Sequence, residues 1–244
     1  MRTAVISDIH GNLEALISVL DDIQSQQVDS IVSLGDNIGY GADSEKVIQL
    51  LISNDIPSVL GNHEIAVLND KVFNWYKGDI KKAIEIAIAS LSEDSLMYLR
   101  ESKINISNSG CFFVHGFPPD SFRLYLHEVS DDQLKRAFSK MKEHLCFVGH
   151  THMLRLICYE NNQVLFHQMD KAVLKIQKNK KYIINVGSVG QPREGNAQAK
   201  YVIWDSLTYQ LGIRSVEYDS ATAAKKIITA GIPSRFANMI NRKL

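Results

Sequence analysis

The chain has 244 residues, 27 basic and 27 acidic side chains and no net charge at pH 7, and 45% of its residues are hydrophobic. This balance argues against a surface built mainly for nucleic acid, which usually carries a basic excess. No apolar run approaches the about 20 residues that a membrane helix needs, and the first residues resemble a strand rather than a signal peptide. We therefore expect a cytoplasmic protein that makes no membrane contact.

The first 155 residues alternate short apolar runs with helical patterns. The apolar, mostly β-branched runs predict buried strands, and helices of this length between them favour a mainly parallel sheet. Asn12 is placed as the N-cap of the first helix, and Ser130 with Gln133 has capping-box spacing before the last. The predicted strands are 4–6, 31–34, 58–60, 112–114 and 146–148, and the predicted helices are 13–20, 44–54, 79–91, 92–100 and 130–143.

The pattern changes after about residue 155. Asn161 and Asn162 separate two strand-like runs, which is a hairpin signal. We expect mostly antiparallel strands that form a second sheet packed on the first, followed by two helices, all within a single domain over residues 1–244. The predicted strands are 154–159, 164–168, 182–186, 201–204 and 212–217, and the predicted helices are 221–230 and 234–242.

Five short polar segments, each containing a glycine, follow the predicted strands of the first half. They have the sequences DIHGN (8–12), GDN (35–37), GNHE (61–64), HG (115–116) and GHTH (149–152), and they contain five of the eight histidines. Polar residues at the carboxyl ends of strands are where open α/β sheets bind ligands. The glycines are expected to supply the positive φ that tight turns at strand ends need.

The side chains of these segments are those that bind first-row divalent metals. Carboxylate, amide and imidazole donors can share two ions, with one carboxylate counted for both, and a pair of metals indicates phosphate-ester chemistry. The predicted ligands are Asp8, His10, Asp36, Asn62, His115, His150 and His152. The remaining histidines outside the segments, His127, His144 and His167, are expected to be hydrogen-bonded core residues.

Other residues near the predicted ligands have a predicted role as well, and Glu64, Arg193 and the aromatic run 73–77 have two interpretations each. His63 is left over after the ligands are assigned and could act as a general acid. Glu64 either supports this site or is a solvated charge or a helix-start residue, and Arg193 either clamps phosphate oxygens or is a surface arginine. The aromatic residues of 73–77 either stack a base or pin a loop, and residues 117–125 are expected to form a wall of the pocket.

The order D-x-H, G-D, G-N-H-E, H-G and G-H-T-H resembles the calcineurin-like metallophosphoesterase superfamily, and the segment NVGSVGQPR at 185–193 resembles its small prokaryotic, phosphodiesterase-type branch. The resemblance implies a four-layer α/β/β/α sandwich of two mixed β-sheets flanked by helices. It implies that one metal is bound by Asp8, His10, Asp36 and His152. The other would be bound by Asp36, Asn62, His115 and His150, with His63 as the general acid.

The chain departs from one branch of that superfamily. Its protein phosphatases and symmetrical dinucleoside tetraphosphatases carry an arginine after G-D and then D-R-G, whereas this chain has Asn37 and Gly39-Tyr40-Gly41. We therefore expect hydrolysis of small phosphodiesters or nucleotide-type phosphate esters by in-line attack of a metal-held hydroxide, with Asp36, Asn62 and His63 taking part. Mn²⁺ is the favoured metal, with Fe, Ni, Co or Zn left open.

Other functions remain as alternatives at this stage. They are a protein serine/threonine phosphatase, a dinucleoside polyphosphate hydrolase and, less favoured, a binding scaffold of the same fold. A scaffold would be expected to have lost ligand positions, and here each is filled. The sequence indicates neither the physiological substrate nor the oligomeric state.

Overall fold

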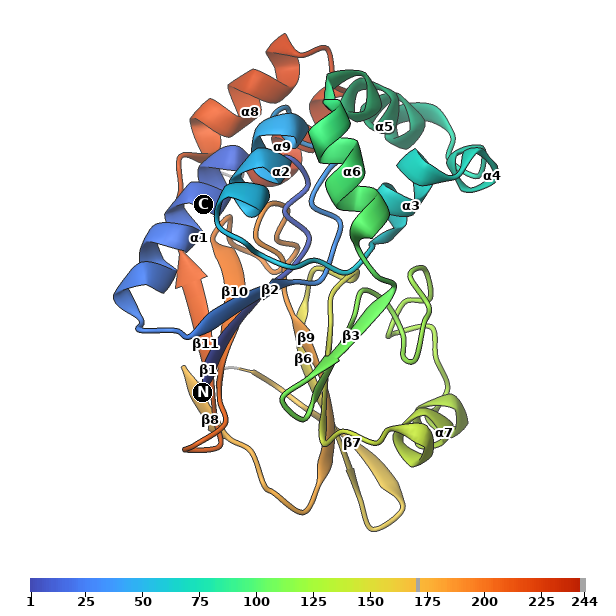
Figure 1. The fold of residues 1–244 in the computed structure, drawn as a ribbon, viewed down its shortest axis with the longest axis vertical. Helices are drawn as coiled ribbons and strands as arrows, with labels where there is room; N and C mark the ends of the chain where they lie inside the picture. Colours follow the sequence, from blue (N-terminus) through green and yellow to red (C-terminus); the bar gives the residue numbers. More distant parts are fainter. Residues whose placement is uncertain (170–171, 242–244) are drawn as a thin grey trace.

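The strands of the computed structural model, which describes residues 1–169 and 172–241, form two mixed sheets (Figure 1). One sheet has the strand order β2-β1-β10-β11-β8 and the other β3-β4-β5-β9-β6-β7. The strands are β1 (Arg2–Ile6), β2 (Ser30–Ser33), β3 (Asn105–Asn108), β4 (Cys111–Val114), β5 (Leu145–Val148), β6 (Leu154–Glu160), β7 (Gln163–His167), β8 (Val173–Lys175), β9 (Lys181–Val186), β10 (Ala199–Asp205) and β11 (Gln210–Val216).

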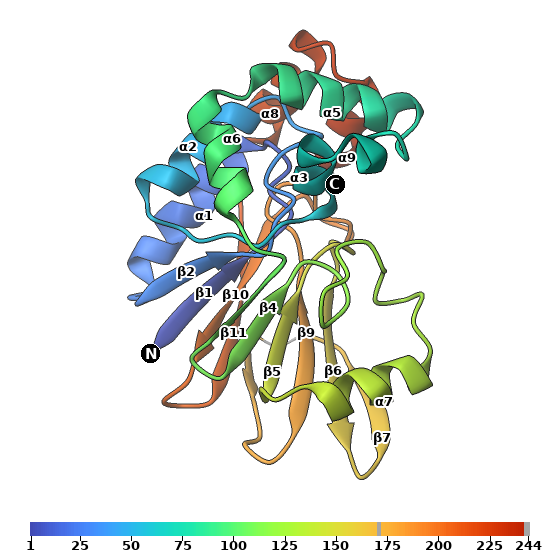
Figure 2. The same ribbon diagram turned by 45° about the vertical axis from the view of Figure 1, so that its right-hand side comes forward.

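Helices cover the outer faces of both sheets, with α1 and α2 against the first and α7 against the second (Figure 2). Asn12 caps α1 by accepting from the backbone N–H of Ala15, and Ser130 with Gln133 forms the predicted capping box of α7. The helices are α1 (Leu13–Ser25), α2 (Ser44–Ser53), α3 (Asn62–Leu68), α4 (Asp70–Phe73), α5 (Gly78–Ser90), α6 (Glu93–Glu101), α7 (Asp131–Lys140), α8 (Ser220–Thr229) and α9 (Ser234–Ile240).

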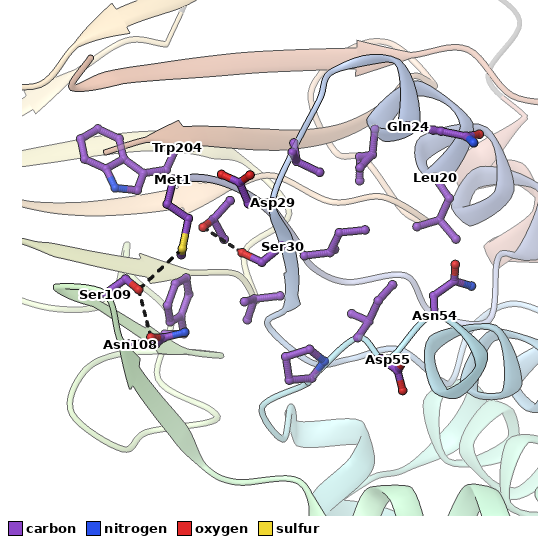
Figure 3. A pocket seen from close by; sticks show the side chains of 18 of the residues that line it. Met1, Leu20, Gln24, Asp29, Ser30, Asn54, Asp55, Asn108, Ser109 and Trp204 are labelled. Atoms are coloured by element: carbon purple, nitrogen blue, oxygen red, sulfur yellow. Dashed lines mark hydrogen bonds between the residues drawn. The ribbon is translucent and has the colours of Figure 1, made fainter. Parts of the chain in front are cut away.

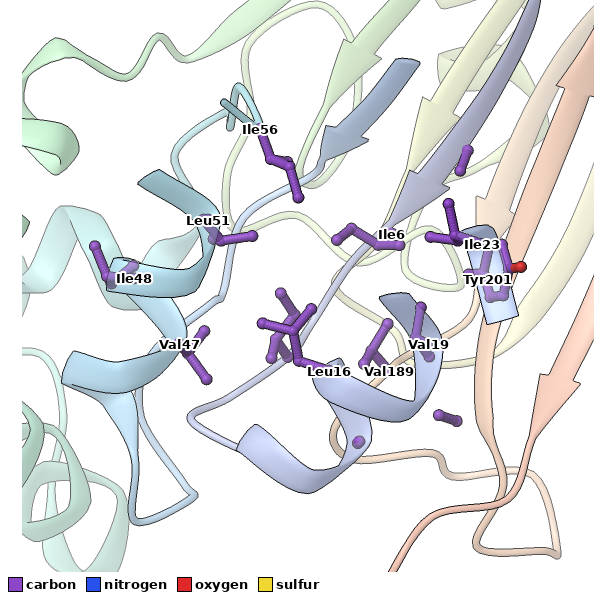
Figure 4. Close-up of a cluster of buried hydrophobic side chains, with 14 of the residues drawn as sticks. Ile6, Leu16, Val19, Ile23, Val47, Ile48, Leu51, Ile56, Val189 and Tyr201 are labelled. Carbon is purple, nitrogen blue, oxygen red and sulfur yellow. The ribbon is translucent and has the colours of Figure 1, made fainter. Parts of the chain in front are cut away.

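Alternation along the strands produces three core layers. Ala4 and Ile6 of β1 pack against α1 and α2, around Leu16 and Tyr201 (Figure 4), whereas Val5 points between the two sheets. A third apolar cluster joins the second sheet to α7. The predicted four-layer α/β/β/α sandwich of two mixed sheets is therefore confirmed.

The predicted division into a parallel sheet followed by an antiparallel one is wrong. β1 pairs in parallel with β2 but antiparallel with β10, and β5 pairs in parallel with both β4 and β9. Each sheet thus combines strands from both halves of the chain. The apolar period of a strand indicates which face is buried, but it does not identify the neighbouring strand.

Several predicted elements also differ from the structure, among them a predicted strand and the ends of two helices. Residues 58–60 are buried but make only isolated bridges, Ser33 with Ser58 and Val59 with Lys103, because the chain turns into α3 directly afterwards. Helix α7 ends at Lys140 rather than 143. Helix α9 ends at Ile240, and Arg242, the last residue of its predicted range, lies outside the described residues.

The absence of long apolar runs and the state of the cysteines can be described from the fold. Within the described residues, no helix has both the length and the apolar character needed to cross a membrane. Cys111, Cys146 and Cys158 are all buried and free.

A charged cluster ties α1 to the first sheet. Asp22 of α1 accepts hydrogen bonds from Tyr201 Oη at 2.7 Å and from Arg214 Nη2 at 2.6 Å. The hydrogen bond from Arg214 is the main reason that the pKa of Asp22 is lowered from its ordinary 3.8. The cluster thereby holds α1 against β10 and β11.

We expect Asp22→Asn to lower the free energy of unfolding at pH 7 by about 1–2 kcal/mol. The hydrogen bonds from Tyr201 and Arg214 would then have a neutral acceptor in place of a carboxylate, at a partly solvated site. Since folding lowers this pKa, the wild-type advantage is complete above pH 3.8 and declines as the pH falls through the lowered pKa. Urea unfolding at pH 7 and pH 3 measures it. Glu93→Gln, at an exposed ion pair, is the control; an equal loss in both variants would contradict the prediction.

Candidate metal centre

The predicted ligands come together where the carboxyl ends of β1, β2, β4 and β5 meet. Asp8 and His10 follow β1, Asp36 follows β2, His115 follows β4, His150 and His152 follow β5, and Asn62 begins α3. Backbone hydrogen bonds join these loops, from Asp8 N–H to Gly35 O at 3.0 Å and from Gly149 N–H to His115 O at 2.8 Å. All seven predicted ligands are buried, with exposed fractions between 0 and 8%.

The backbone of the ligand loops is in the left-handed region at the ligands themselves. The φ angles are 54° at Asp8, 50° at His10, 50° at Asp36, 67° at His150 and 61° at His152. Non-glycine residues at positive φ are uncommon and cost of order 1–3 kcal/mol each, and they concentrate at functional sites. The expectation that glycines supply the positive φ is therefore only partly right, because the ligand residues also adopt it.

Two of the glycines serve close packing instead. A Cβ atom on Gly149 would lie 2.0 Å from Ser7 Oγ and 2.6 Å from Asp8 Oδ2. A Cβ atom on Gly61 would lie 2.2 Å from Asp36 Oδ1. Only glycine therefore lets these loops approach the two carboxylates.

Each of the four predicted ligand histidines has one ring nitrogen bonded to a backbone carbonyl. The contacts are His10 Nδ1 to Ile38 O (3.2 Å), His115 Nδ1 to Leu34 O (2.8 Å), His150 Nε2 to Arg123 O (3.0 Å) and His152 Nδ1 to Gln191 O (2.7 Å). A carbonyl can only accept, so these nitrogens carry the N–H. In the neutral ring the other nitrogen then presents a lone pair, which is how metal-binding histidines are usually oriented.

The inward-facing atoms are acceptors that lie close to one another. His10 Nε2 and His152 Nε2 are 3.1 Å apart, and His115 Nε2 is 3.1 Å from His150 Nδ1 and 3.2 Å from Asn62 Oδ1. Facing lone pairs repel unless a cation or proton lies between them. The geometry therefore calls for positive charge at two places.

Asp8 and Asp36 each use one oxygen for the scaffold and direct the other inward. Asp8 Oδ2 accepts from Ser7 Oγ and from the backbone of His150, while Oδ1 is buried without a hydrogen-bond partner among the described residues and lies 3.2 Å from His152 Nε2. Asp36 Oδ2 lies 3.3 Å from His115 Nε2 and 3.8 Å from His10 Nε2. This oxygen thus faces both groups of histidines.

The charges of the centre are those of a cation site. Burial opposes ionisation of both carboxylates, but the neighbouring histidines, chiefly His152 for Asp8 and His115 for Asp36, hold their pKa values low. Burial lowers the pKa of His150 to about 3. It also disfavours the His115 cation, but the Asp36 carboxylate outweighs it and raises the pKa of His115 to about 9. Two buried anions surrounded by mostly neutral imidazoles fit divalent cations bound by oxygen and nitrogen.

His63 lies at the centre but is held differently from the other histidines. Its backbone N–H donates to Asp36 Oδ1 at 2.9 Å, and its Nε2 is 4.0 Å from Asp36 Oδ2. Its Nδ1 is buried and has no hydrogen-bond partner among the described residues. The ring packs edge-on against Tyr40, which stacks on Phe236 of α9.

Glu64 is a buried residue of the scaffold, so the interpretation as a solvated charge is wrong. It is 1% exposed, and its carboxylate accepts from the backbone N–H groups of Asp36 (2.8 Å), Asn37 (2.7 Å) and Gly61 (2.9 Å). Burial, and then the Asp36 charge, raises the pKa of Glu64 to about 7. It thus ties the Asp36 loop to the start of α3 and makes no hydrogen bond to His63.

Arg193 lies at the rim of the centre. It is half-buried, and its Nε has no hydrogen-bond partner among the described residues. Burial raises the pKa of both Tyr40 and Tyr125, and the Arg193 charge partly offsets this at each. These rings pack against His10 and His150 respectively, at 4.4 and 4.0 Å between centroids.

The aromatic residues of 73–77 contact residues 117–125. Trp75 is 52% exposed and stacks on Phe122, with the Arg123 guanidinium 4.9 Å from its ring. This contact favours the interpretation that the aromatics pin a loop. Tyr76, which the sequence did not single out, accepts a hydrogen bond from Asn62 Nδ2 at 2.8 Å. Its only signal in the sequence was its place in an aromatic run.

Other sequence candidates lie elsewhere. His127, His144 and His167 are exposed, so the expectation that they are core residues is wrong.

A cavity of about 840 Å³ lies beside β2, between α1 and β3, and is lined by residues such as Leu20, Ser30 and Trp204 (Figure 3). None of the predicted ligands lines it.

The comparisons with known proteins agree with this geometry. A family profile described as the calcineurin-like phosphoesterase superfamily domain matches residues 1–208. The uncharacterized protein MJ0912 of Methanocaldococcus jannaschii is 34% identical over 236 residues, which are 94% of this chain and 93% of that protein.

Solved structures show the same likeness. A metallophosphoesterase from Sphaerobacter thermophilus is 31% identical, with 98% of each chain covered and a TM-score of 0.83. The hypothetical protein PH1004 from Pyrococcus horikoshii OT3 is 17% identical, with 98% of this chain and 97% of that chain covered and a TM-score of 0.76, which is a likeness of fold alone. The resemblance seen in the motifs is confirmed.

We expect Glu64→Gln to lower the free energy of unfolding by about 2–4 kcal/mol, because the amide nitrogen cannot accept from the buried backbone N–H groups that the second carboxylate oxygen satisfies. Displacement of Asp36 should also weaken Mn²⁺ binding. Urea unfolding and Mn²⁺ titration measure these effects. Glu101→Gln, on the exposed end of α6, is the control, and equal stability of the two variants would disprove the role given to Glu64.

Proposed function

Because the chain belongs to the calcineurin-like phosphoesterase superfamily, we propose that it hydrolyses phosphate esters with two bound divalent metal ions. The observation that carries this proposal is the pair of acceptor clusters around Asp8 and Asp36. Their inward-facing atoms repel one another unless cations lie between them. A binding scaffold of the same fold would have no need for such a strained and charged arrangement.

The proposed ligand sets follow the two clusters. The potential ligand atoms of Asp8, His10 and His152 lie within 4.8 Å of one another, as do those of Asp36, His115 and His150. Asn62 belongs with the second cluster, since its Oδ1 lies 3.2 Å from His115 Nε2. The proposed sets are therefore Asp8, His10, Asp36 and His152 for one ion and Asp36, Asn62, His115 and His150 for the other.

A third grouping of His10, Asp36 and His63 competes with these sets. We assign His63 to acid catalysis instead, because its outer nitrogen lacks the carbonyl partner that fixes each of the four ligand rings. Without that bond the ring is free to carry a proton on the nitrogen that faces the substrate. His63 would then donate this proton to the leaving oxygen of the ester.

The bound ions would polarise the phosphoryl group and activate a water molecule. The protein's own groups orient the substrate. The Asn62 amide and His63 stabilise charge on the phosphoryl oxygens, and the Arg193 guanidinium can hold two of these oxygens at the rim. The donor set favours Mn²⁺ and also suits Fe, Ni, Co or Zn.

We propose small phosphodiesters or nucleotide-type phosphate esters as substrates. The chain has Asn37 where the protein phosphatase and symmetrical tetraphosphatase branch has an arginine. The Asn37 side chain is also occupied, since it accepts from Ser33 Oγ at 2.6 Å and donates to Ser58 Oγ at 2.9 Å. It therefore offers no phosphate clamp at that place.

We expect the Mn²⁺-loaded protein to hydrolyse a generic aryl phosphodiester, and His63→Ala to lower kcat by about 10²–10⁴-fold, the usual contribution of a general acid. Steady-state kinetics measure this, with metal content checked in each variant. His167→Ala, an exposed histidine of β7, is the control.

A substrate panel decides the remaining alternatives. It should contain mononucleotides, cyclic dinucleotides, dinucleoside polyphosphates and phosphopeptides. Preference for phosphopeptides or dinucleoside polyphosphates would replace the proposed substrate class. Metal-loaded wild type that is inactive on the whole panel would reject the enzyme proposal.

Arg193→Ala should raise KM about tenfold with metal content unchanged, because a charge-assisted contact to phosphate contributes about 1.5–3 kcal/mol when buried and less at a partly exposed rim. Arg136→Ala, on the exposed face of α7, is the control. An unchanged KM in Arg193→Ala would assign this arginine to the surface.

A further inference from the structure

The amide of Asn62 is the one proposed ligand group that can present either a donor or an acceptor to the centre. Its Oδ1 lies 3.2 Å from His115 Nε2, and its Nδ2 donates to the hydroxyl of Tyr76 at 2.8 Å. From this contact we infer that Tyr76 is a positioning residue for the metal centre, which acts by accepting the Asn62 amide hydrogen while the amide oxygen faces the metal. The inference rests on the proposed function, since Asn62 needs positioning only as a ligand.

The orientation of this amide matters because its two ends have opposite roles. The oxygen has lone pairs for a cation, whereas the nitrogen has only donors. Turned over, the amide would present its N–H₂ group to the centre and would offer no lone pair to an ion. The metal-binding orientation therefore has to compete with an alternative that binds no metal.

Tyr76 stabilises the metal-binding orientation of the Asn62 amide by accepting a hydrogen bond from its nitrogen. Asn62 is only 8% exposed, so without the Tyr76 hydroxyl its N–H₂ group would lose a hydrogen-bond partner whenever the oxygen faces the ion. In the metal-free protein no ion holds the amide oxygen in place, so the amide can turn to satisfy its N–H₂ group. The loss of the hydroxyl should therefore weaken metal binding more than it weakens the fold.

The ring of Tyr76 is held independently of its hydroxyl. It lies between α4 and α5 and packs against an apolar cluster that includes Leu60, Val72 and Ile84. Phenylalanine would keep this packing and remove only the hydroxyl. Tyr98 supplies a matched control, because its hydroxyl is also hydrogen-bonded, by donating to Ile56 O at 2.7 Å, in a different part of the structure.

The test is a calorimetric titration of Mn²⁺ into chelator-stripped wild type, Tyr76→Phe and Tyr98→Phe. We expect two ions to bind wild type, and Tyr76→Phe to bind one of them about 10-fold more weakly, the lower end of the usual loss for a partner of a ligand. Tyr98→Phe should bind both ions as wild type does. The Tm of the metal-free Tyr76→Phe protein should lie close to that of metal-free wild type.

The same titration in an Asn62→Ala background tests the route. If Tyr76 acts through Asn62, adding Tyr76→Phe to Asn62→Ala should weaken Mn²⁺ binding no further. Equal Mn²⁺ affinity of wild type and Tyr76→Phe, a further loss in the Asn62→Ala background, or a loss of metal-free Tm as large as that of Tyr98→Phe would each overturn the inference. Wild type that binds fewer than two ions would instead overturn the dinuclear proposal on which it rests.

Discussion

Two buried carboxylates, Asp8 and Asp36, impose the constraint on which the rest of this structure depends. Each is fully enclosed and ionised, and burying such charges is costly unless opposite charge is nearby. The scaffold supplies hydrogen bonds to one oxygen of each, from Ser7 and His150 to Asp8 and from His63 to Asp36. The other oxygen of each faces the centre, so a bound cation would also offset the electrostatic cost of burying these charges.

Holding these oxygens in place requires unfavourable backbone geometry, and the surrounding structure offsets it. Five proposed ligands have left-handed backbones, and Gly61 and Gly149 allow contacts that a side chain would block. Glu64 ties the strained Asp36 loop to the start of α3 through backbone N–H groups. The strain is tolerable because the loops extend from strands whose residues fill three apolar layers.

The sequence predicted which side chains gather at the centre better than it predicted the sheets, for a physical reason. A proposed ligand such as His115 is marked locally, by a buried strand before it and a glycine after it. The neighbours of a strand are chosen by contacts far away in the sequence, and so β10 beside β1 and β9 beside β5 could not be foreseen. The hydrogen bonds of Glu64 to the Asp36 loop and of Tyr76 to Asn62 were not predicted for the same reason, because their partners are brought together only by the fold.

The outer partners of the histidines separate ligands from other roles more sharply than distance does. Distance alone groups His63 with His10 and Asp36, yet its outer nitrogen has no carbonyl partner among the described residues. Its ring is instead held by Tyr40, which stacks on Phe236 of α9. That helix lies beyond residue 208, where the family match ends. The proposed metal ligands therefore lie within residues 1–208, whereas the packing around the proposed acid extends beyond that match to Phe236, so the position of the acid depends on contacts that the ligand set does not need.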